Sequence, residues 1–493
     1  MKSSDTFDQK ESQEPTLKQK TAKGLLWGGI GSFLQQAIGL VFGVLIMRIL
    51  TPNDYGLIAM LSIFTAIANS IMDSGFTTAL INRNIIRNED YNAVFWFNAL
   101  AGIALYIILF FCAPLIAEFY DKPVLTNLSR LLFLSFIFSS LGIAHNAFLL
   151  KNIMAKQRSI VDSVAVLVSS GISLILALNG YIYWGLAIQV VSQSIISTLL
   201  RWFFSPWRPT LNFDFSPLRE MFSFSIKMFF TNIILQVTAN ILSVVLGRYY
   251  GEKETGYYAQ GNKWALLGTS VITNMINGVA QPVLVNAVND KERQKNMFRK
   301  MTRFGAFVSF PCLLGFAFVG EEFIMIMVGN KWLDSLFYLQ LFCIWGSISF
   351  LWYLYTNLLL VHNKSNIYMW GMLVLSVFQI VMALSLFSFG VKIMAIAYIC
   401  CYFMGLFLWH YFANRIIGLR FWHVIKDLFP YFALTMSCIS LCWFFTKGIT
   451  DIYLRFFLKI VITIVLYSVV MWYSNSVIVK ECYNYIRQKT SDS

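Results

Sequence analysis

The chain consists of about fourteen apolar segments of helix length, and no loop between them is long enough to fold as a soluble domain. A helix of roughly 20 apolar residues crosses the ~30 Å hydrocarbon core of a bilayer. Hydrophobic residues make up 58% of the 493 residues and charged residues only 13%, whereas soluble domains carry about 25% charged residues. The sequence therefore predicts an all-α integral membrane protein of about 14 transmembrane helices.

The positions of Lys and Arg predict how these segments cross the membrane. The net charge is +14, and most basic residues fall in alternate loops and in the two terminal segments. Cytoplasmic loops of membrane proteins carry such an excess. We therefore expect an even number of crossings with both termini in the cytoplasm, and we interpret the positive charge as a topology signal rather than a nucleic-acid-binding surface.

Composition changes along the chain predict its organisation. Residues 1–23 are polar and lack the apolar core of a signal peptide, so we expect a disordered cytoplasmic tail. The Pro-rich, polar stretch 205–220 is expected to be a cytoplasmic linker between an N-terminal six-helix lobe, 24–204, and a C-terminal six-helix lobe, 221–418. The remaining segment, 419–493, is expected to form two extra helices and a second cytoplasmic tail.

A short internal echo indicates that the two lobes are repeats. Arg48 and Gly56 recur 200 positions later as Arg248 and Gly256, each time at the end of the first helix of a lobe. Lobes of six helices both start from the cytoplasm, so they are predicted to be parallel repeats about an axis along the membrane normal, an arrangement found in transporters. At a helix C-terminus either arginine has two possible roles, one complementing the helix dipole and the other binding a ligand.

Polar residues inside the predicted spans are the candidate binding residues. A charged group near the bilayer centre costs about 3 kcal/mol on insertion scales, so it is expected to face a cavity or a partner. Several spans carry polar residues every three or four positions, which places them on one helix face. The candidates for a hydrated cavity between the lobes are Arg48, Asn69, Asp73, Lys227, Gln236, Asn240, Arg248, Lys263, Asn274, Asn277 and Gln281. For any one of them, a hydrogen bond that joins two helices is the competing interpretation.

Known catalytic and cofactor motifs are missing from the sequence. It contains no phosphate-binding Gly-x-x-x-x-Gly-Lys-Ser/Thr loop, no His-Glu-x-x-His and no Gly-x-Ser-x-Gly. Four scattered histidines and eight cysteines in or beside apolar runs give no metal-binding spacing. We therefore expect no cofactor, no metal and no enzyme activity, although an intramembrane polysaccharide polymerase or ligase remains a distinct alternative that would normally need a larger periplasmic loop.

Two segments of the N-terminal lobe resemble a known transporter family. RILTPNDYG, from Arg48 to Gly56, and MDSG, which contains Asp73, match an Arg-x-Leu-x-Pro-x-x-(Phe/Tyr)-Gly turn followed by Asp-x-Gly. The chain thereby resembles bacterial polysaccharide flippases of the Wzx type, in the superfamily that includes MATE multidrug exporters and the lipid II flippase. YYAQGNKWALL, around Lys263, is similar to the equivalent segment of the second lobe, and the fourteen-span plan is similar to the WzxC-like branch.

The resemblance implies a function. It implies that a polyprenyl-diphosphate-linked oligosaccharide moves from the cytoplasmic to the periplasmic leaflet of the bacterial inner membrane by alternating access, for O-antigen, capsule or exopolysaccharide synthesis. On this reading Lys227 and Lys263, with Arg48 or Arg248, offset the diphosphate charge, and Asp73 couples protonation to lobe movement. The implied partners are membrane lipids and the polymerase and glycosyltransferases of the same pathway. A cation-coupled multidrug exporter or a lipid II flippase of the same fold remain alternatives.

Overall fold

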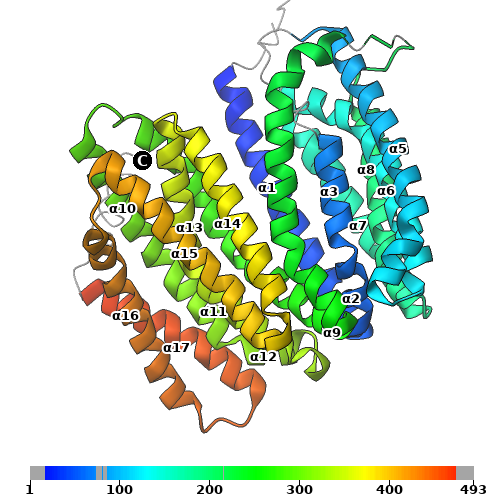
Figure 1. Cartoon of the computed structure of the whole chain (residues 1–493). Helices are drawn as coiled ribbons and strands as arrows, with labels where there is room; N and C mark the ends of the chain where they lie inside the picture. Colours follow the sequence, from blue (N-terminus) through cyan, green and yellow to red (C-terminus); the bar gives the residue numbers. More distant parts are fainter. Residues whose placement is uncertain (1–16, 74–79, 81–85, 212, 215, 474–493) are drawn as a thin grey trace, which may run out of the picture. The chain divides into compact units, whose positions relative to one another are not determined.

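The computed structural model describes residues 17–73, 80, 86–211, 213–214 and 216–473, and over these residues the chain forms helices joined by short turns, without a β-strand (Figure 1). The all-α membrane fold predicted from the sequence is confirmed. The helices of the first half are α1 (Leu17–Ile49), α2 (Pro52–Met60), α3 (Ser62–Asp73), α5 (Asn88–Tyr120), α6 (Val124–Lys151), α7 (Ala155–Leu178) and α8 (Ile182–Phe204).

The second half begins with α9, a helical segment of 70 residues that is interrupted at Gly251. Its helices are α9 (Ser216–Val285), α10 (Lys291–Ser309), η1 (Phe310–Leu314), α11 (Gly315–Phe318), α12 (Gly320–Met327), η2 (Asn330–Trp332), α13 (Ser335–Val361), α14 (Ser365–Ser385), η3 (Phe387–Phe389), α15 (Val391–Ile417), α16 (Phe421–Thr446) and α17 (Ile452–Tyr473). The segments from α10 to α12 follow one another with little interruption.

Thirteen helical segments in the described part of the chain are long and apolar enough to cross a membrane. One of them, Asn232–Val285, has 54 residues, which at 1.5 Å per residue is about 80 Å and more than twice the hydrocarbon thickness. It contains Gly251, whose φ of 84° is not helical. Counting this helix as two crossings gives the predicted fourteen, and the protein is a multi-pass membrane protein.

The chain divides into two compact units whose boundaries fall inside helices. The first unit comprises Met1–Gly43, Ile71–Ala113 and Asn127–Phe229, and the second comprises Val44–Ser70, Pro114–Thr126 and Phe230–Ser493. Helix α5, for example, passes from the first unit to the second at Pro114, a proline inside the helix. Short segments from the first half of the sequence therefore pack as part of the second unit.

The first unit is built around small and polar contacts between helices. In α7 the side chains of Ser169, Ser170 and Ser173 are buried, and the close pairing of α7 with α8 depends on Gly185, where a Cβ would lie 3.1 Å from the Ser173 carbonyl oxygen. Gln189 of α8 donates to Ser170 Oγ at 2.9 Å. Small residues and interhelical hydrogen bonds of this kind stabilise helix pairs where lipid removes the hydrophobic driving force.

The beginning of the predicted linker is held against the first unit. Trp207 is buried, and its ring lies 5.8 Å from Tyr91 and 5.1 Å from His145, measured between ring centroids. The backbone of Thr210 makes two hydrogen bonds with side chains of α5. Its N–H donates to Asn92 Oδ1 at 2.9 Å, and its carbonyl accepts from Trp96 Nε1 at 2.7 Å. This half of the linker is a packed segment rather than a free tether.

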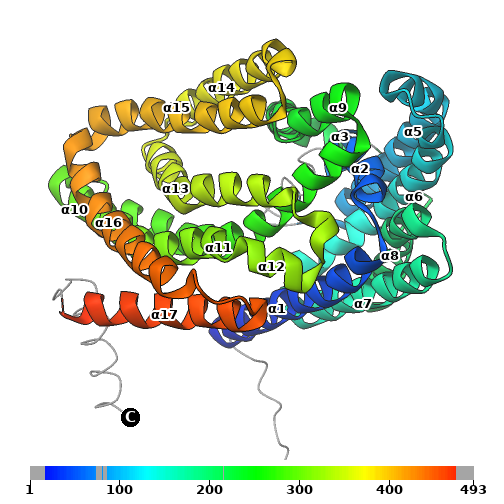
Figure 2. The same cartoon turned by 90° about the horizontal axis from the view of Figure 1, so that it is seen from below.

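In the second unit α13 lies in the middle of the surrounding helices (Figure 2). It contacts α10, α11, α12, α14 and α15. Phe350 and Tyr355 of α13 are fully buried, and glycine makes room for such rings, because a Cβ on Gly305 of α10 would lie 2.4 Å from the Phe350 ring. Helix α13 thus forms the core of this unit.

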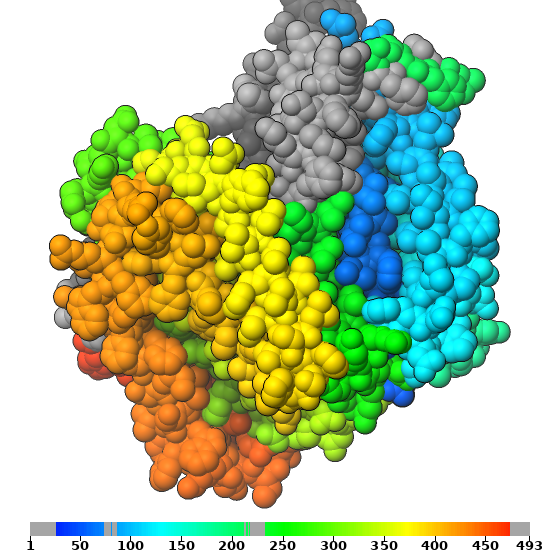
Figure 3. Space-filling model, viewed as in Figure 1, coloured from blue at the N-terminus to red at the C-terminus, as the bar shows by residue number. Residues whose placement is uncertain are grey.

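The outer helices of the second unit present apolar side chains outward. Trp370, Val374, Val377 and Val381 of α14 are each more than half exposed, and Figure 3 shows the side chains of α14, in yellow, covering one face of this unit. Exposed apolar side chains at helical spacing are expected where a helix faces lipid.

Helix α10 begins much earlier than the sequence predicts. The apolar pattern places the start of this crossing near residue 303, but the helix begins at Lys291. Asp290 explains the difference, because its Oδ1 accepts from the Arg293 N–H at 3.0 Å and caps the helix. The charged stretch that follows is therefore a helical extension of the span.

Two further helices follow the repeats, as predicted. Helix α16 packs against α10 and α17, and α17 packs against α12. Asp427 of α16 accepts a two-pronged contact from Arg299 of α10, with Nε–Oδ2 at 2.7 Å and Nη2–Oδ1 at 3.0 Å. Bidentate arginine–carboxylate pairs have fixed geometry, so this contact sets how α16 lies on α10.

Candidate functional site

The repeat echo predicted from the sequence corresponds to a reciprocal contact in the second unit. A Cβ on Gly56 of α2 would lie 1.7 Å from the Glu252 carbonyl oxygen, and a Cβ on Gly256 of α9 would lie 2.0 Å from the Pro52 carbonyl oxygen. The two glycines are 200 positions apart, and so are Pro52 and Glu252. Each half of the repeat therefore presents the same glycine to the same position of the other half.

The helix breaks beside these glycines are also equivalent. Thr51 has φ −99° and ψ 165° and separates α1 from α2. Its N–H and Oγ1 both donate to Asp54 Oδ2, at 2.8 Å and 2.6 Å. The position 200 residues later is Gly251, with φ 84° and ψ −178°, a conformation that glycine adopts readily because it has no Cβ.

Arg48 and Arg248 close the C-terminal ends of other helices. Arg48 donates from Nε to the Met327 carbonyl at 2.8 Å and from Nη2 to the Ile326 carbonyl at 2.7 Å, at the end of α12. Arg248 donates to the Phe119 carbonyl at the end of α5. The last carbonyls of a helix have no hydrogen-bond partner within the helix and carry partial negative charge. Each guanidinium supplies hydrogen-bond donors and a positive charge to these carbonyls.

Two lysines complete this arrangement. Lys122, just after α5, lies 2.9 Å from the Glu252 carboxylate, and Lys331, just after α12, donates to the Arg48 carbonyl at 2.9 Å. We call residues 47–56, 119–122, 248–256 and 326–332 the hub. All of it lies in the second unit, and the side chains of Arg48, Arg248 and Lys331 are directed at backbone carbonyls.

Four other predicted site residues have exposed side chains. They are Asn69 of α3 and Lys263, Asn274 and Gln281 of α9, and within the described part of the chain none of the four has a hydrogen-bond or ion-pair partner. Residues 263, 274 and 281 fall on one face of α9, because at 100° per residue their spacings bring them within about 20° of each other. This stripe is available to a ligand or to water.

Asn240 and Asn277 instead make bonds within the protein. Asn240 Nδ2 donates to the Gln236 carbonyl at 2.9 Å. Asn277 Oδ1 accepts from Asn357 Nδ2 of α13 at 3.0 Å. Asn277 thereby fits the interpretation of polar residues as links between helices. The side chains of Asp73 and Lys227, which were also predicted as site residues, lie outside the described residues.

A cavity of about 400 Å³ lies inside the second unit, and we call it the aromatic cavity. Trp345 of α13 stacks on Tyr402 of α15 with ring centroids 4.9 Å apart and planes 23° apart. Trp352, two turns further along α13, lies edge-on to Trp345 at 5.9 Å, and Gly405 leaves room for it, since a Cβ there would lie 2.5 Å from its ring. The aromatic lining consists of Tyr258, Phe342, Trp345, Trp352, Tyr353, Tyr398 and Tyr402.

A second compartment of about 260 Å³ adjoins the aromatic cavity, with which it shares the wall residues Trp352 and Tyr402. It is more polar at its far end, where Gln236 of α9 and Gln379 of α14 line it. Gln236 is a predicted site residue. Among the described residues that line the two compartments, none carries a charge.

The sequence does not predict the aromatic lining, because polar residues inside spans indicate a cavity and aromatic residues there do not. Trp345 and Trp352 do carry a weak signal, since they are seven positions apart and so share a helix face. The same spacing is typical of aromatic residues that face lipid, so only the packing of α13 among its neighbours distinguishes the two environments.

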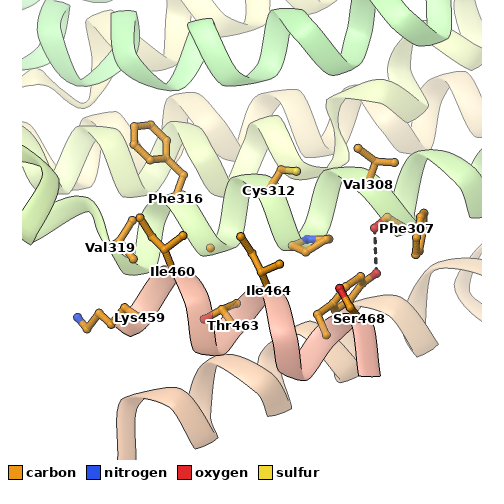
Figure 4. Close-up of a pocket in the computed structure, with 13 residues that line it drawn as sticks. Phe307, Val308, Cys312, Phe316, Val319, Lys459, Ile460, Thr463, Ile464 and Ser468 are labelled. Atoms are coloured by element: carbon orange, nitrogen blue, oxygen red, sulfur yellow. Dashed lines mark hydrogen bonds between the residues drawn. The ribbon is translucent and has the colours of Figure 1, made fainter. Parts of the chain in front are cut away.

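A further cavity of about 470 Å³ lies between the α10–α11 region and α17 (Figure 4). Its walls are mostly apolar and include Val308, Phe316, Ile460 and Ile464. Tyr467 Oη donates to the Phe307 carbonyl at 2.9 Å and closes one end. We call it the outer cavity.

A buried cluster of charges adjoins the outer cavity. Glu322 of α12 has a fully buried carboxylate, and its Oε1 lies 2.7 Å from both Lys459 Nζ and Arg455 Nε of α17. The Lys459 ammonium also lies 4.3 Å from the centre of the Phe318 ring. Arg455 Nη2 also lies 3.9 Å from the Glu321 carboxylate, so two cations face two carboxylates where α17 meets α12.

His362, which follows α13 outside the spans, links three segments. Its Nε2 lies 2.9 Å from Gln294 Oε1, and Gln294 Nε2 donates to the Leu284 carbonyl at 2.9 Å. Burial, together with the positive charges of Lys364 and Lys291, lowers the pKa of His362. Because Gln294 presents its oxygen to the ring, the neutral Nε2–H form of the imidazole fits this contact.

The described residues contain no group of three His, Cys, Asp or Glu side chains placed to hold a metal ion. What the geometry does provide is a set of surfaces and cavities within a helical membrane scaffold. An exposed polar stripe, a neutral aromatic cavity and an apolar cavity together suit the binding of a large amphipathic molecule.

The fold is that of a known class of membrane transporters. The lipid II flippase MurJ in its inward closed conformation matches 90% of this chain and 99% of its own, with a TM-score of 0.73 and 14% identity. A MATE family multidrug resistance transporter in its inward-facing conformation matches 78% of this chain and 94% of its own, with a TM-score of 0.63 and 14% identity. Within this class the chain belongs to the polysaccharide biosynthesis protein family, whose model matches residues 45–336.

Two curated relatives agree with this assignment. The teichuronic acid biosynthesis protein TuaB of Bacillus subtilis is 25% identical over 72% of this chain and 74% of its own length. The lipopolysaccharide biosynthesis protein WzxC of Escherichia coli is 25% identical over 67% of this chain and 68% of its own length. The resemblance predicted from the Arg48–Gly56 segment is confirmed.

Proposed function

We propose that this protein flips a polyprenyl-diphosphate-linked oligosaccharide from the cytoplasmic to the periplasmic leaflet of the bacterial inner membrane, with both termini in the cytoplasm. The product would supply O-antigen, capsule or exopolysaccharide synthesis. The observation that carries the proposal is the family match over residues 45–336. The helical transporter fold is in accord with it, as is a relative from Rhizobium meliloti named as a succinoglycan biosynthesis transport protein.

The proposed mechanism is movement of the protein rather than bond chemistry. Transport by alternating access needs a binding surface that is exposed in turn to either side, and it needs no cofactor. The cargo is a product of membrane glycosyltransferases and a substrate of a polymerase, so those enzymes and the lipids around the carrier are its proposed partners. We assign no catalytic residue.

Lys263 is the proposed contact for the diphosphate. Its side chain is exposed on α9, and within the described part of the chain no carboxylate pairs with it. A diphosphate that leaves water needs a cation and hydrogen-bond donors, and Asn274 and Gln281 offer amide groups on the same helix face. We retain Lys227 as a second cation and Asp73 as the group that couples protonation to transport.

Arg48 and Arg248 have a different proposed role. Both guanidinium groups donate to carbonyls at the ends of other helices, which leaves them fewer donors for a phosphate. We assign them to the hub, where they hold the two halves of the repeat together. The outer cavity, with its apolar walls, is the proposed location for part of the isoprenoid chain.

The test is complementation of a bacterial host whose own flippase gene for the same pathway is deleted. Lipid extracts and leaflet-specific labelling of spheroplasts measure how much lipid-linked oligosaccharide stays on the cytoplasmic side. Wild-type protein is expected to clear this pool, whereas Asp73→Asn and Lys263→Ala leave it in place at equal expression. Lys447→Ala is the matched control, because Lys447 lies at the outer end of α16 against Trp443 and Phe444.

The same host distinguishes the alternatives. If the wild-type protein leaves the cytoplasmic pool unchanged but restores growth to cells depleted of the lipid II flippase, the cargo is lipid II. If it lowers the accumulation of a cationic dye instead, the protein is a drug exporter. Normal transport by both the Asp73 and the Lys263 variants would overturn their assignment.

A further inference from the structure

We propose that the aromatic cavity of the second unit binds a sugar ring of the cargo, namely the sugar nearest the diphosphate. This inference rests on the proposed function and specifies which part of the cargo the cavity takes. Among the described residues that line the cavity and its second compartment, none is charged. A diphosphate would find no counter-ion there, so the occupant is a neutral group.

Three aromatic side chains of the cavity are partly exposed. Trp345, Trp352 and Tyr402 are only partly buried, in contrast to Tyr355 and Trp409 of the same helices, which are completely buried. The face of an aromatic ring is negative, and the C–H bonds on the flat side of a pyranose are weakly positive. The exposed parts of these aromatic side chains therefore suit the flat side of a sugar.

Two amides in the cavity lack partners among the described residues. Asn262 lines the aromatic cavity and Gln236 lines its second compartment, and neither side-chain amide is hydrogen-bonded to another described residue. An amide can donate two hydrogen bonds and accept two more, and leaving it unpaired away from water costs free energy. Sugar hydroxyls both donate and accept, so they match these groups, whereas an isoprenoid chain does not.

The size and the opening of the cavity fit one or two sugar rings. Its volume of about 400 Å³ falls in the range of known small-molecule sites, roughly 300–1,000 Å³, and a compartment of about 260 Å³ adjoins it. Leu266 and Tyr353 line it and are 58% and 39% exposed, which places its mouth between α9 and α13.

The proposed diphosphate contact lies beside this mouth. Lys263 directly follows the cavity residue Asn262 and precedes the mouth residue Leu266 by three positions. Residues three apart on a helix are neighbours on its surface. A diphosphate held by Lys263 therefore brings its first sugar next to the opening, which explains why a neutral aromatic cavity lies so close to an exposed cation.

The experiment compares two lipids as probes of the full-length protein in nanodiscs. One is undecaprenyl diphosphate, and the other is the undecaprenyl-diphosphate-linked oligosaccharide extracted from a flippase-deleted host. Native mass spectrometry or a competition assay gives Kd for each. The variants are Asn262→Ala and Trp345→Leu, and the control is Trp443→Leu, which removes a 55% exposed ring on the outside of α16.

Wild type and the control are expected to bind the glycosylated lipid more tightly than the bare lipid. Each cavity variant is expected to weaken binding of the glycosylated lipid about tenfold, or 1.4 kcal/mol, with no change for bare undecaprenyl diphosphate. An unchanged ratio of the two Kd values in both variants would overturn the sugar site. So would ethidium binding that is lost in Trp345→Leu, because the cavity would then be a cation site.

Failure of the proposed function gives a different result. A wild-type protein that binds neither lipid overturns both proposals. A wild-type protein that binds and transports the glycosylated lipid, with cavity variants of unchanged Kd ratio, overturns the sugar site alone. Thermal unfolding of each variant shows whether it is folded, and Asn262→Ala, which removes only a half-buried amide, keeps the test valid if Trp345→Leu is unstable.

Discussion

Gly56 and Gly256 occupy equivalent positions in the two halves of the repeat, and each packs against the backbone of the other half. Gly56 meets Glu252 and Gly256 meets Pro52. The four residues form two pairs, each 200 positions apart in the sequence. The residues that recur after 200 positions are thus the residues that make the same packing contact in each half of the repeat.

Replacing either glycine with alanine is expected to destabilise the protein. The new Cβ would overlap a carbonyl oxygen, at 1.7 Å for Gly56 and 2.0 Å for Gly256, and a backbone atom cannot rotate away as a side chain can. Overpacking of this kind costs roughly 1–3 kcal/mol and occasionally more. The measurement is thermal unfolding in detergent. Gly39→Ala is the control, since a Cβ there meets nothing within 4 Å, and equal melting temperatures for all three variants would refute the contact.

Arg48→Met is expected to lower stability rather than cargo affinity. The variant loses two hydrogen bonds from a cation to the end of α12, and with partial exposure to water we expect a loss of about 1–2 kcal/mol. Unfolding and lipid binding are measured on the same preparation. Arg420→Met, at the exposed start of α16, is the control. The opposite result would be an Arg48 variant with a normal melting temperature and weaker binding of the lipid-linked oligosaccharide. It would show that Arg48 contacts the cargo.

Glu322→Gln is expected to be among the most damaging single changes. It leaves Arg455 and Lys459 as two cations facing a neutral group in a buried position, and breaking a buried ion pair typically costs about 3–5 kcal/mol. Unfolding of the purified protein measures the loss. For comparison, Glu292→Gln breaks the exposed Lys295–Glu292 pair, which is worth at most about 1 kcal/mol.

The same cluster allows a second test. Changing all three residues together, with Glu322→Leu, Arg455→Met and Lys459→Met, removes the buried charges of the cluster and leaves only Glu321, whose side chain is 48% exposed. Replacing a complete buried ion cluster with apolar residues is often neutral or stabilising. We expect the triple variant to be more stable than Glu322→Gln alone, and a triple variant that is equally unstable would mean that the charges have another role.

Acidification below about pH 6.5 is expected to destabilise the folded protein through His362. The pKa of His362 is lowered in the folded protein by burial and by Lys364 and Lys291, so the folded state binds the proton less readily than the unfolded state. Above about pH 6.5 the His362 ring is neutral in both the folded and the unfolded state, so it causes no loss of stability. As the pH falls, the stability of the folded protein decreases until the pH is below the lowered pKa of His362. Melting temperatures between pH 5 and 8 test this, and His362→Gln should show a shallower decrease.

Several features of the fold were predictable from local sequence. Apolar length gives the number of crossings, and the Arg48–Gly56 echo gives the repeat, because both depend on residue types at fixed spacing. The apolar pattern does not locate the start of α10, because its first turns are charged, whereas Asp290 caps them as helix. The break in α9 at Gly251 was predictable, because the sequence places Arg248 at the end of the first helix of the second lobe.

The candidate site was only partly predictable. Polar residues in spans were found, but the sequence does not distinguish Asn277, bonded to Asn357, from Asn274, which is exposed. The two lie three positions apart, and only the neighbouring helix decides which is bonded. The aromatic cavity was missed because Trp345 and Trp352 have the spacing of any lipid-facing pair.

The hub has a consequence for the order of biosynthesis. Arg48 and Met47 bind residues 326, 327 and 332, so their partners are synthesised almost three hundred residues later. The first helices must therefore remain in the membrane with open ends while the rest of the chain is made. Contacts of such long range form late and slow the final assembly. A truncated chain that stops within the second half would expose unpaired carbonyls and arginines, which are features that membrane quality control is able to recognise.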